Sequence, residues 1–149
     1  MIKGLTTLEI LIAVSVLIML SVIVIGSFGA FRGARELDQA SDDIVGFLRE
    51  ARSRTLASED GSQFGVHFET SRTVLFKGNT FVDGALENKT AYPPRRVEIF
   101  NINIAGSNVL FERLTGRANP NGDVSVRLKS SPGQIRIIII ESSGNAYVQ

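Results

Sequence analysis

A long uncharged segment lies close to the start of the chain. Ile10 to Phe31 form 22 consecutive positions without a charge, and 14 of them are Ile, Leu, Val or Phe. An apolar helix of about 20 residues crosses the hydrocarbon core of a bilayer. Each apolar residue favours insertion by roughly 0.3 to 0.6 kcal/mol, and a carboxylate costs about 3 kcal/mol even at the helix centre. The pattern therefore predicts a membrane-spanning helix, with Glu9 at its edge.

A cleavable secretory signal is the weaker interpretation of this segment. Such signals have an apolar region of about 7 to 15 residues, followed by a cleavage site of small residues. The segment here is longer, and the pattern that follows it is helical. The flanking cations, Lys3 on one side and Arg32 and Arg35 on the other, leave its orientation open.

The helical pattern continues beyond the apolar segment. Apolar residues recur on one face at Leu37, Ile44, Leu48 and Ala51, which predicts an amphipathic helix. Gly61 can adopt the left-handed conformation that ends a helix. We predict one helix over residues 5–58, about 80 Å long at 1.5 Å per residue.

After Gly61 the pattern changes to an alternation of apolar and polar positions, which is typical of strands. Residues 78–95 are predicted to form a loop, and Ile137 to Ile140 a central strand that is apolar on both faces. An amphipathic helix followed by strands indicates an α+β fold, in which the helix packs on an antiparallel sheet. Strands are predicted over 64–68, 73–76, 97–104, 109–114, 124–128, 134–141 and 146–148.

The composition narrows the possible chemistry. The chain has 149 residues, a net charge of +1 and no cysteine, so disulfides and thiolate metal sites are excluded. His67 is the single histidine and has no second histidine or cysteine with which to form a metal site or a catalytic dyad. Asp42-Asp43 and Glu59-Asp60 lack the ligand spacing of a calcium loop, which favours solvated positions. We therefore predict no catalytic residue, no metal and no cofactor, and a protein that is not an enzyme.

The arginines leave one binding function open. If several of them converged on one face, they could hold phosphates, although a solvated, charge-balanced surface is favoured. They are Arg49, Arg52 and Arg54 in the predicted helix, Arg95 and Arg96 in the predicted loop, and Arg113, Arg117, Arg127 and Arg136, with Lys129, among the strands.

The first nine residues place Lys3-Gly4 and the sequence LTTLE directly before the uncharged segment. This arrangement resembles the type IV pilin and type II secretion pseudopilin superfamily. In such prepilins a membrane-embedded prepilin peptidase cuts after the glycine of a short basic leader and usually methylates the new amino terminus. A glutamate then stands fifth in the mature chain. The resemblance implies cleavage after Gly4, N-methylation at Leu5, and a role in subunit assembly for Glu9.

A second stretch narrows the resemblance. FLREARSRTLASEDGSQFGVHF, residues 47–68, is similar to the GspH/FimT-like minor pilins and pseudopilins, whose helix typically ends in an ARS-containing segment before a polar turn and the first strand. The resemblance implies a pilin-like architecture in four parts. These are a cleaved leader (1–4), a transmembrane and polymerisation helix (5–31), an amphipathic helix half (32–60) and a β-rich globular head (61–149).

The implied function is that of a minor pilin or pseudopilin, a structural subunit of a type IV pilus or a type II secretion filament. The implied location is the bacterial inner membrane, as a single-pass protein with its head outside the cytoplasm, and then an extracellular or periplasmic filament. The implied partners are other pilins or pseudopilins, the prepilin peptidase, the inner-membrane assembly platform and membrane lipid.

A DNA-binding minor pilin of a DNA-uptake (competence) pilus is the alternative. Some FimT-like proteins are thought to bind DNA through arginines in the turn before the last strand. The corresponding turn here, Ser143 to Tyr147, contains no arginine. Nucleic acid is therefore the less favoured partner, and the alternative stays open.

Glu9 has a physical role to fill in such an assembly. A carboxylate is costly in hydrocarbon unless it is paired. In a filament, Glu9 of one subunit can pair with the Leu5 amine of a neighbour, which would fix the axial stagger between subunits. Two other interpretations remain open: a carboxylate solvated at the membrane interface, and pairing with the amine of its own chain, four residues away.

Overall fold

The computed structural model describes residues 6–149, and within this range the side chains of residues 23–28 and 30 are not described. The predicted processing site, Gly4 and Leu5, lies outside the described residues. The chain divides into two compact units, Met1–Ala34 and Arg35–Gln149. Each unit is described by itself below.

A single long helix, α1 (Thr7–Leu56), belongs to both units. Thr6 caps its start, because its Oγ1 accepts a hydrogen bond from the Glu9 backbone N–H at 3.3 Å. After Leu56 the chain turns through η1 (Glu59–Gly61), where Ser58 and Gly61 have φ angles of 51° and 65°. The left-handed conformation predicted for Gly61 is confirmed. Among the described residues, no helix is both long enough and apolar enough to qualify as a membrane span.

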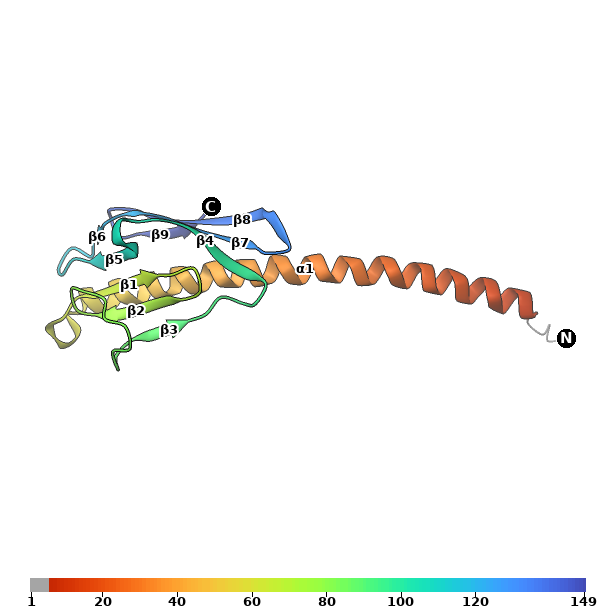
Figure 1. Ribbon diagram of the computed structural model, residues 1–149, viewed down its shortest axis with the longest axis horizontal. Helices are drawn as coiled ribbons and strands as arrows, with labels where there is room; N and C mark the ends of the chain where they lie inside the picture. Colours follow the sequence, from red (N-terminus) through yellow and green to blue (C-terminus); the bar gives the residue numbers. More distant parts are fainter. Residues whose placement is uncertain (1–5) are drawn as a thin grey trace. The chain divides into compact units, whose positions relative to one another are not determined.

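The second unit contains two antiparallel sheets beside the C-terminal part of α1 (Figure 1). Sheet A has the strand order β3-β2-β1-β5-β6. Its strands are β1 (Phe64–Phe68), β2 (Thr73–Lys77), β3 (Lys89–Ala91), β5 (Asn108–Phe111) and β6 (Ala118–Asn119). Phe64 pairs with Lys77 and Phe68 with Thr73, so β1 and β2 form the predicted hairpin.

Sheet B has the strand order β4-β7-β8-β9. Its strands are β4 (Val97–Asn103), β7 (Gly122–Leu128), β8 (Ser131–Ile140) and β9 (Ala146–Val148). The short turn η2 (Ala105–Ser107) carries the chain from β4 in sheet B to β5 in sheet A. The chain therefore passes from sheet B to sheet A between β4 and β5.

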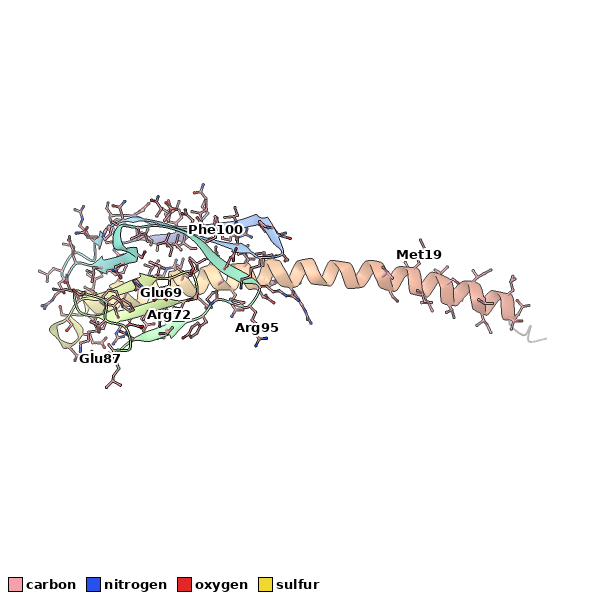
Figure 2. All side chains as sticks on the ribbon, in the orientation of Figure 1. Met19, Glu69, Arg72, Glu87, Arg95 and Phe100 are labelled. Atoms are coloured by element: carbon pink, nitrogen blue, oxygen red, sulfur yellow. The ribbon has the colours of Figure 1, made fainter. Side chains whose placement is uncertain are left out.

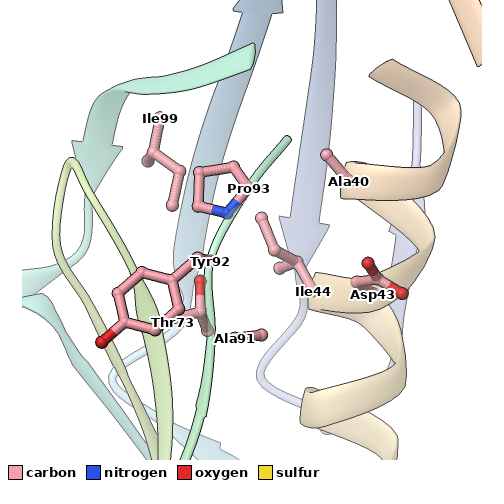
Figure 3. A pocket seen from close by; sticks show the side chains of 8 residues that line it. All are labelled: Ala40, Asp43, Ile44, Thr73, Ala91, Tyr92, Pro93 and Ile99. Carbon is pink, nitrogen blue, oxygen red and sulfur yellow. The ribbon is translucent and has the colours of Figure 1, made fainter. Parts of the chain in front are cut away.

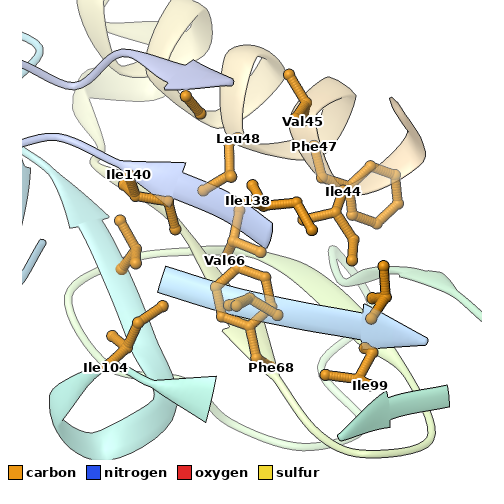
Figure 4. Close-up of a cluster of buried hydrophobic side chains, with 14 of the residues drawn as sticks. Ile44, Val45, Phe47, Leu48, Val66, Phe68, Ile99, Ile104, Ile138 and Ile140 are labelled. Carbon is orange, nitrogen blue, oxygen red and sulfur yellow. The ribbon is translucent and has the colours of Figure 1, made fainter. Parts of the chain in front are cut away.

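The helix and both sheets contribute to one hydrophobic core. Figure 4 shows side chains of α1 packed against side chains from the strands. Leu37, Leu48 and Ala51 of α1 are 0–1% exposed. This arrangement confirms the expected α+β, pilin-like architecture, because the apolar stripe of the helix is buried on the strands. The labelled residues in Figure 4 are Ile44, Val45, Phe47 and Leu48 of α1, Val66 and Phe68 of sheet A, Ile99, Ile138 and Ile140 of sheet B, and Ile104 beyond β4.

Three details differ from the sequence predictions. β8 lies inside its sheet, between β7 and β9, but only one of its faces is buried: Ile138 is 0% exposed and Ile137 is 37% exposed. The strand predicted over 109–114 ends at Phe111, because Leu114 has a φ of 71° and stands in a turn. The predicted loop 78–95 contains β3, whose three residues are too few to produce a recognisable alternation.

Candidate functional site

The N-terminal part of α1 presents apolar side chains in every direction. All side chains of residues 6–22 are exposed, including Leu8 at 70% and Met19 at 73% (Figure 2). A helix that is apolar on all sides is stable only when other apolar groups surround it, in lipid or in a bundle of helices. This surface is the main candidate functional site of the first unit.

Glu9 lies in the first turn of this helix and is exposed. A negative charge is favourable there, because the first backbone N–H groups of a helix carry partial positive charge. No cation of the described residues lies within ion-pair distance of its carboxylate. Leu5, whose amine is the expected partner, lies outside the described residues, so pairing with that amine stays a prediction.

Arg52 joins the helix to two distant segments of the head. Its Nε donates to the Gly116 carbonyl at 3.1 Å, next to sheet A. Its Nη1 donates to Asn145 Oδ1 at 3.2 Å and its Nη2 to the Ser143 carbonyl at 3.3 Å, in the turn between β8 and β9 of sheet B. The arginine of the ARS segment thus connects the helix to both sheets.

The segments around Arg52 meet so closely that they require glycine. A Cβ at Gly144 would collide with the carbonyl oxygen of Gly116 and would stand 2.9 Å from Arg52 Nε. Gly144 also has a φ of 84°, which L side chains rarely adopt. The guanidinium can therefore reach both carbonyls only because Gly116 and Gly144 have no side chain.

We expect Arg52→Ala to lower the free energy of unfolding by about 2 kcal/mol, because charge-assisted hydrogen bonds in a partly buried position are lost. Arg49→Ala is the matched control: Arg49 is an exposed arginine one turn earlier, and its side chain has no hydrogen bond or ion pair to the described residues. We expect it to change stability by less than about 0.5 kcal/mol. Urea unfolding of the detergent-solubilised chain, followed by circular dichroism, measures both. Equal losses for the two variants would contradict the assigned role.

The acidic pairs that the sequence raised as calcium candidates are either paired with cations or exposed to solvent. Glu59 accepts two hydrogen bonds from Arg54, at 2.9 and 2.6 Å, and these lower the pKa of its carboxyl. Asp60 pairs with Lys77 at 3.0 Å. Asp42 and Asp43 are exposed. In the part of the chain that the structure describes, no three His, Cys, Asp or Glu residues come together as metal ligands would.

His67 has partners that account for it structurally. Its Nδ1 lies 2.7 Å from Asn108 Oδ1, and its ring stacks on Phe81 with the ring centroids 4.0 Å apart. Its Nε2 lies 3.4 Å from the Glu69 carboxylate. These contacts join β1 to β5 and to the loop after β2, which supports the structural role expected for this histidine.

Arg72 also contacts the loop after β2. It donates two hydrogen bonds to Glu69, at 2.9 and 2.8 Å, and its Nη2 lies 3.1 Å from Asp83 (Figure 2 labels Glu69 and Arg72). These hydrogen bonds lower the pKa of the Glu69 and Asp83 carboxyls and raise that of the guanidinium. All three groups are therefore ionised at neutral pH.

Several of these arginines are paired with acids or hydrogen-bonded within the head. Arg136 lies 2.9 Å from Asp38, and Arg127 lies 2.7 Å from Glu98. The turn from Ser143 to Tyr147 does receive an arginine, Arg52 of α1, but its guanidinium is already hydrogen-bonded there. The structure therefore brings together no row of unpaired arginines at the turn where DNA contacts were considered.

A narrow crevice lies between α1 and the segment that follows β3 (Figure 3). Its walls include Ala40 and Ile44 of the helix, Tyr92 and Pro93 of the connection, and Ile99 of β4. Its volume of about 20 Å³ suffices for about one water molecule. The crevice is too small for an organic ligand.

Comparison with known proteins adds the decisive observation. No protein-family model and no curated protein matches the sequence. The structure, however, is similar to the type IV minor pilin FimU of Pseudomonas aeruginosa, with a TM-score of 0.59 and 12% identity over 80% of this chain and 92% of that chain. The chain has a type IV pilin fold. The minor pseudopilin EpsH from the type 2 secretion system of Vibrio cholerae is also similar, with a TM-score of 0.57 and 13% identity over 76% of this chain and 96% of that chain.

The structure shows which of the sequence patterns correspond to contacts in the fold. The apolar stripe of α1, from Leu37 to Ala51, packs against the strands of the head. Arg52 belongs to the segment that the sequence singled out, but its contacts with Gly116 and Asn145 were not predicted. The local signal for them is Gly144, a glycine in the final turn, and nothing in the sequence pairs that turn with the helix.

Proposed function

We propose that the protein is a structural subunit of a type IV pilus or a type II secretion filament and acts by assembly, without catalysis. The observation that carries this proposal is the helix α1. Its C-terminal part is built into a head with a pilin fold, and residues 6–22 of its N-terminal part are exposed and mostly apolar. A minor pilin and a minor pseudopilin share this fold. Exposed apolar helices of neighbouring subunits can bury one another in a bundle.

Before assembly, residues 5–31 are held in the bacterial inner membrane, with the head outside the cytoplasm. The proposal rests on the 22 uncharged positions, which match the length of a bilayer-spanning helix. The assembly platform and surrounding lipid are the partners at this stage. The subunit then leaves the membrane for an extracellular or periplasmic filament.

Glu9 guides the transfer from lipid to filament. A carboxylate at the start of an apolar helix gains most from a positively charged partner. The α-amine of Leu5, exposed by cleavage and still charged after methylation, is the partner supplied by a neighbouring subunit. The pairing fixes how far one helix is displaced along the next.

Processing provides the first test. We expect a prepilin peptidase to cut between Gly4 and Leu5, because a residue without a side chain fits a narrow peptidase site at the membrane face. Intact-mass analysis of protein extracted from membranes should show the loss of Met1 to Gly4, with one added methyl group in most chains. The variant Gly4→Leu should keep the full-length mass. A full-length mass for the wild-type chain in cells that contain the peptidase would refute the pilin proposal.

A DNA-binding pilin is the less favoured function. The final turn contains no arginine of its own, and Arg127 and Arg136 are paired with acids. Binding to a phosphate backbone needs several cations that are available together. We therefore place the function in assembly.

A further inference from the structure

The outer face of sheet B carries apolar side chains that nothing in the chain covers. Along β8, Ile138 and Ile140 belong to the core and are at most 1% exposed, whereas Ile137 on the opposite face is 37% exposed. Ile135 and Tyr147 are also exposed, at 38% and 44%. The solvent-facing side of an antiparallel sheet normally carries polar residues. Apolar side chains gathered on such a face indicate a surface for another molecule.

This face is hollowed beside the start of β7 and the end of β8. The depression has a volume of about 780 Å³, and we call it the β8 hollow. Ile137 and Ile139 supply apolar lining, and two acids, Asp123 and Glu141, also line it. Its other side chains that are open to solvent are polar, and they belong to Asn103, Asn121, Ser142 and Ser143.

The two acids of the β8 hollow have no counter-ion in their own chain. The Asp123 carboxylate accepts a hydrogen bond from the Asn103 amide at 2.8 Å, and the Glu141 carboxylate accepts one from the Ser143 hydroxyl at 3.0 Å. Neither lies within ion-pair distance of a cation among residues 6–149. Arg52 reaches the edge of the hollow, but it donates to the Ser143 carbonyl and to neither acid. Unpaired carboxylates beside exposed isoleucines favour a partner that combines an apolar side chain with cations.

The turn between β5 and β6 has this complementary chemistry. We call residues 112–117 the Leu114 turn, because Leu114 is 88% exposed and has a φ of 71°, which a side chain of this size rarely adopts. Arg113 and Arg117 are exposed, and neither has an ion pair to the described part of the chain. Glu112, the acid of the same turn, accepts a hydrogen bond from the Thr115 hydroxyl at 3.1 Å. The turn therefore presents a leucine between two unpaired arginines.

The Leu114 turn and the β8 hollow are neighbours in one chain, but the turn does not fill the hollow. The Gly116 carbonyl is in contact with Gly144, which follows Ser143 at the edge of the hollow. The leucine nevertheless remains exposed to solvent. A surface that carries two complementary features is self-complementary. Two copies related by a two-fold axis can therefore each place the turn in the hollow of the other.

We propose that two copies of this chain pair through their heads, with the Leu114 turn of each copy in the β8 hollow of the other. The leucine covers the exposed isoleucines of β8, and the two arginines of the turn pair with the two acids of the hollow. A contact made by a six-residue turn is small, so free heads associate weakly. Two chains in one membrane meet at a much higher effective concentration. The pairing thus rests on the membrane location proposed above.

Engineered cysteines test the contact directly, because the chain has no cysteine of its own. One full-length chain carries Leu114→Cys, and a second chain with a different tag carries Ile137→Cys. Both are reconstituted in phosphatidylcholine vesicles, which contain no filament assembly machinery, and are treated with copper phenanthroline. A disulfide forms only when the two Cα atoms come within about 7 Å. We expect a linked pair that carries both tags on a non-reducing gel.

An exposed leucine in another loop provides the matched control. Leu86 is 103% exposed and lies between β2 and β3, away from the Leu114 turn in sequence. Leu86→Cys in place of Leu114→Cys should lower the yield of the linked pair about tenfold, because chance collisions alone then bring the cysteines together. Equal yields for the two leucine positions would overturn the proposal.

Charge reversals test the ion pairs. Arg113→Glu with Arg117→Glu, added to the chain that carries Leu114→Cys, should lower the yield about tenfold, because like charges then face each other. Asp123→Lys with Glu141→Lys, added to the other chain, should restore the yield to within about twofold. Rescue of one pair of reversals by the other shows that the two sets of residues interact. A yield that the first pair does not change, or that the second pair does not restore, would contradict the assigned contact.

Flotation of the vesicles separates this proposal from the proposed function. Chains that do not float with the vesicles would overturn the membrane location and, with it, pairing in the membrane. Chains that float but give no linked pair would overturn the pairing alone. The Leu114 turn and the β8 hollow lie in the head and are distinct from Glu9 and the apolar helix, on which the proposed filament assembly depends.

Discussion

The variant Glu9→Ala is expected to remain in the membrane and to be processed, but to be absent from filaments. Removing the carboxylate only eases burial of the apolar helix, so insertion is not impaired. In the filament, the amine of a neighbouring subunit loses its partner. An uncompensated buried charge costs about 3 to 5 kcal/mol, which corresponds to a loss of incorporation of more than a hundredfold. Immunoblots of sheared filaments and of the membrane fraction measure both pools.

A second acid of the same helix serves as the control. Asp42 is exposed on the part of α1 that belongs to the head, and its side chain pairs with no cation of the described residues. Asp42→Ala should be incorporated as the wild type is. If Glu9→Ala were also incorporated at the wild-type level, the carboxylate would not be the contact that sets the stagger between subunits.

Truncation of the helix should have the second large effect. A chain that starts at Arg35, where the second compact unit begins, is expected to be soluble, monomeric and cooperatively folded. A chain that starts at Gly61 lacks Leu37, Ile44 and Leu48, which are at most 5% exposed. Loss of each such side chain costs about 2 to 5 kcal/mol, and a domain is stable by only about 5 to 15 kcal/mol. We expect the shorter chain to aggregate.

Size-exclusion chromatography and thermal unfolding distinguish the two outcomes. The control is a chain that starts at Glu36, which removes one further residue and no buried apolar side chain. A soluble, cooperatively folding chain from Gly61 onwards would mean that the helix and the sheets do not depend on a common core. The structure would then have to be stabilised by the strands alone.

Local periodicity explains which parts of the fold were predictable. The stripe from Leu37 to Ala51 and the strand patterns of β1, β2 and β7 are signals carried by neighbouring residues, and the structure confirms the helix and these strands. The division of the strands into two sheets was not predicted, because which strands pair depends on contacts between residues far apart in the chain. β6 was missed because two residues cannot show an alternation.

The candidate site was predictable only in part, for the same reason. The leader motif and Glu9 are recognised from adjacent residues, and the structure places Glu9 in the first turn of α1. Arg52 contacts residues 64 and 91 positions away, so its role could not be read from its neighbours. The bulge at Phe100 and the course of the connection that contains Tyr92 also depend on contacts between distant residues, which a loop prediction does not specify.

The contacts of Arg52 have a mechanical consequence. In the proposed filament a subunit is loaded through its helix, and a force along α1 would reach the head through the residues that hold the helix there. Side chains from Leu37 to Ala51 are buried along that part of the helix, and Arg52 attaches its end to Gly116 and to the turn at Asn145. A pull therefore loads all these contacts together in shear, instead of breaking them one after another as in peeling an edge strand. The head can transmit tension without its strands separating from the sheets one at a time.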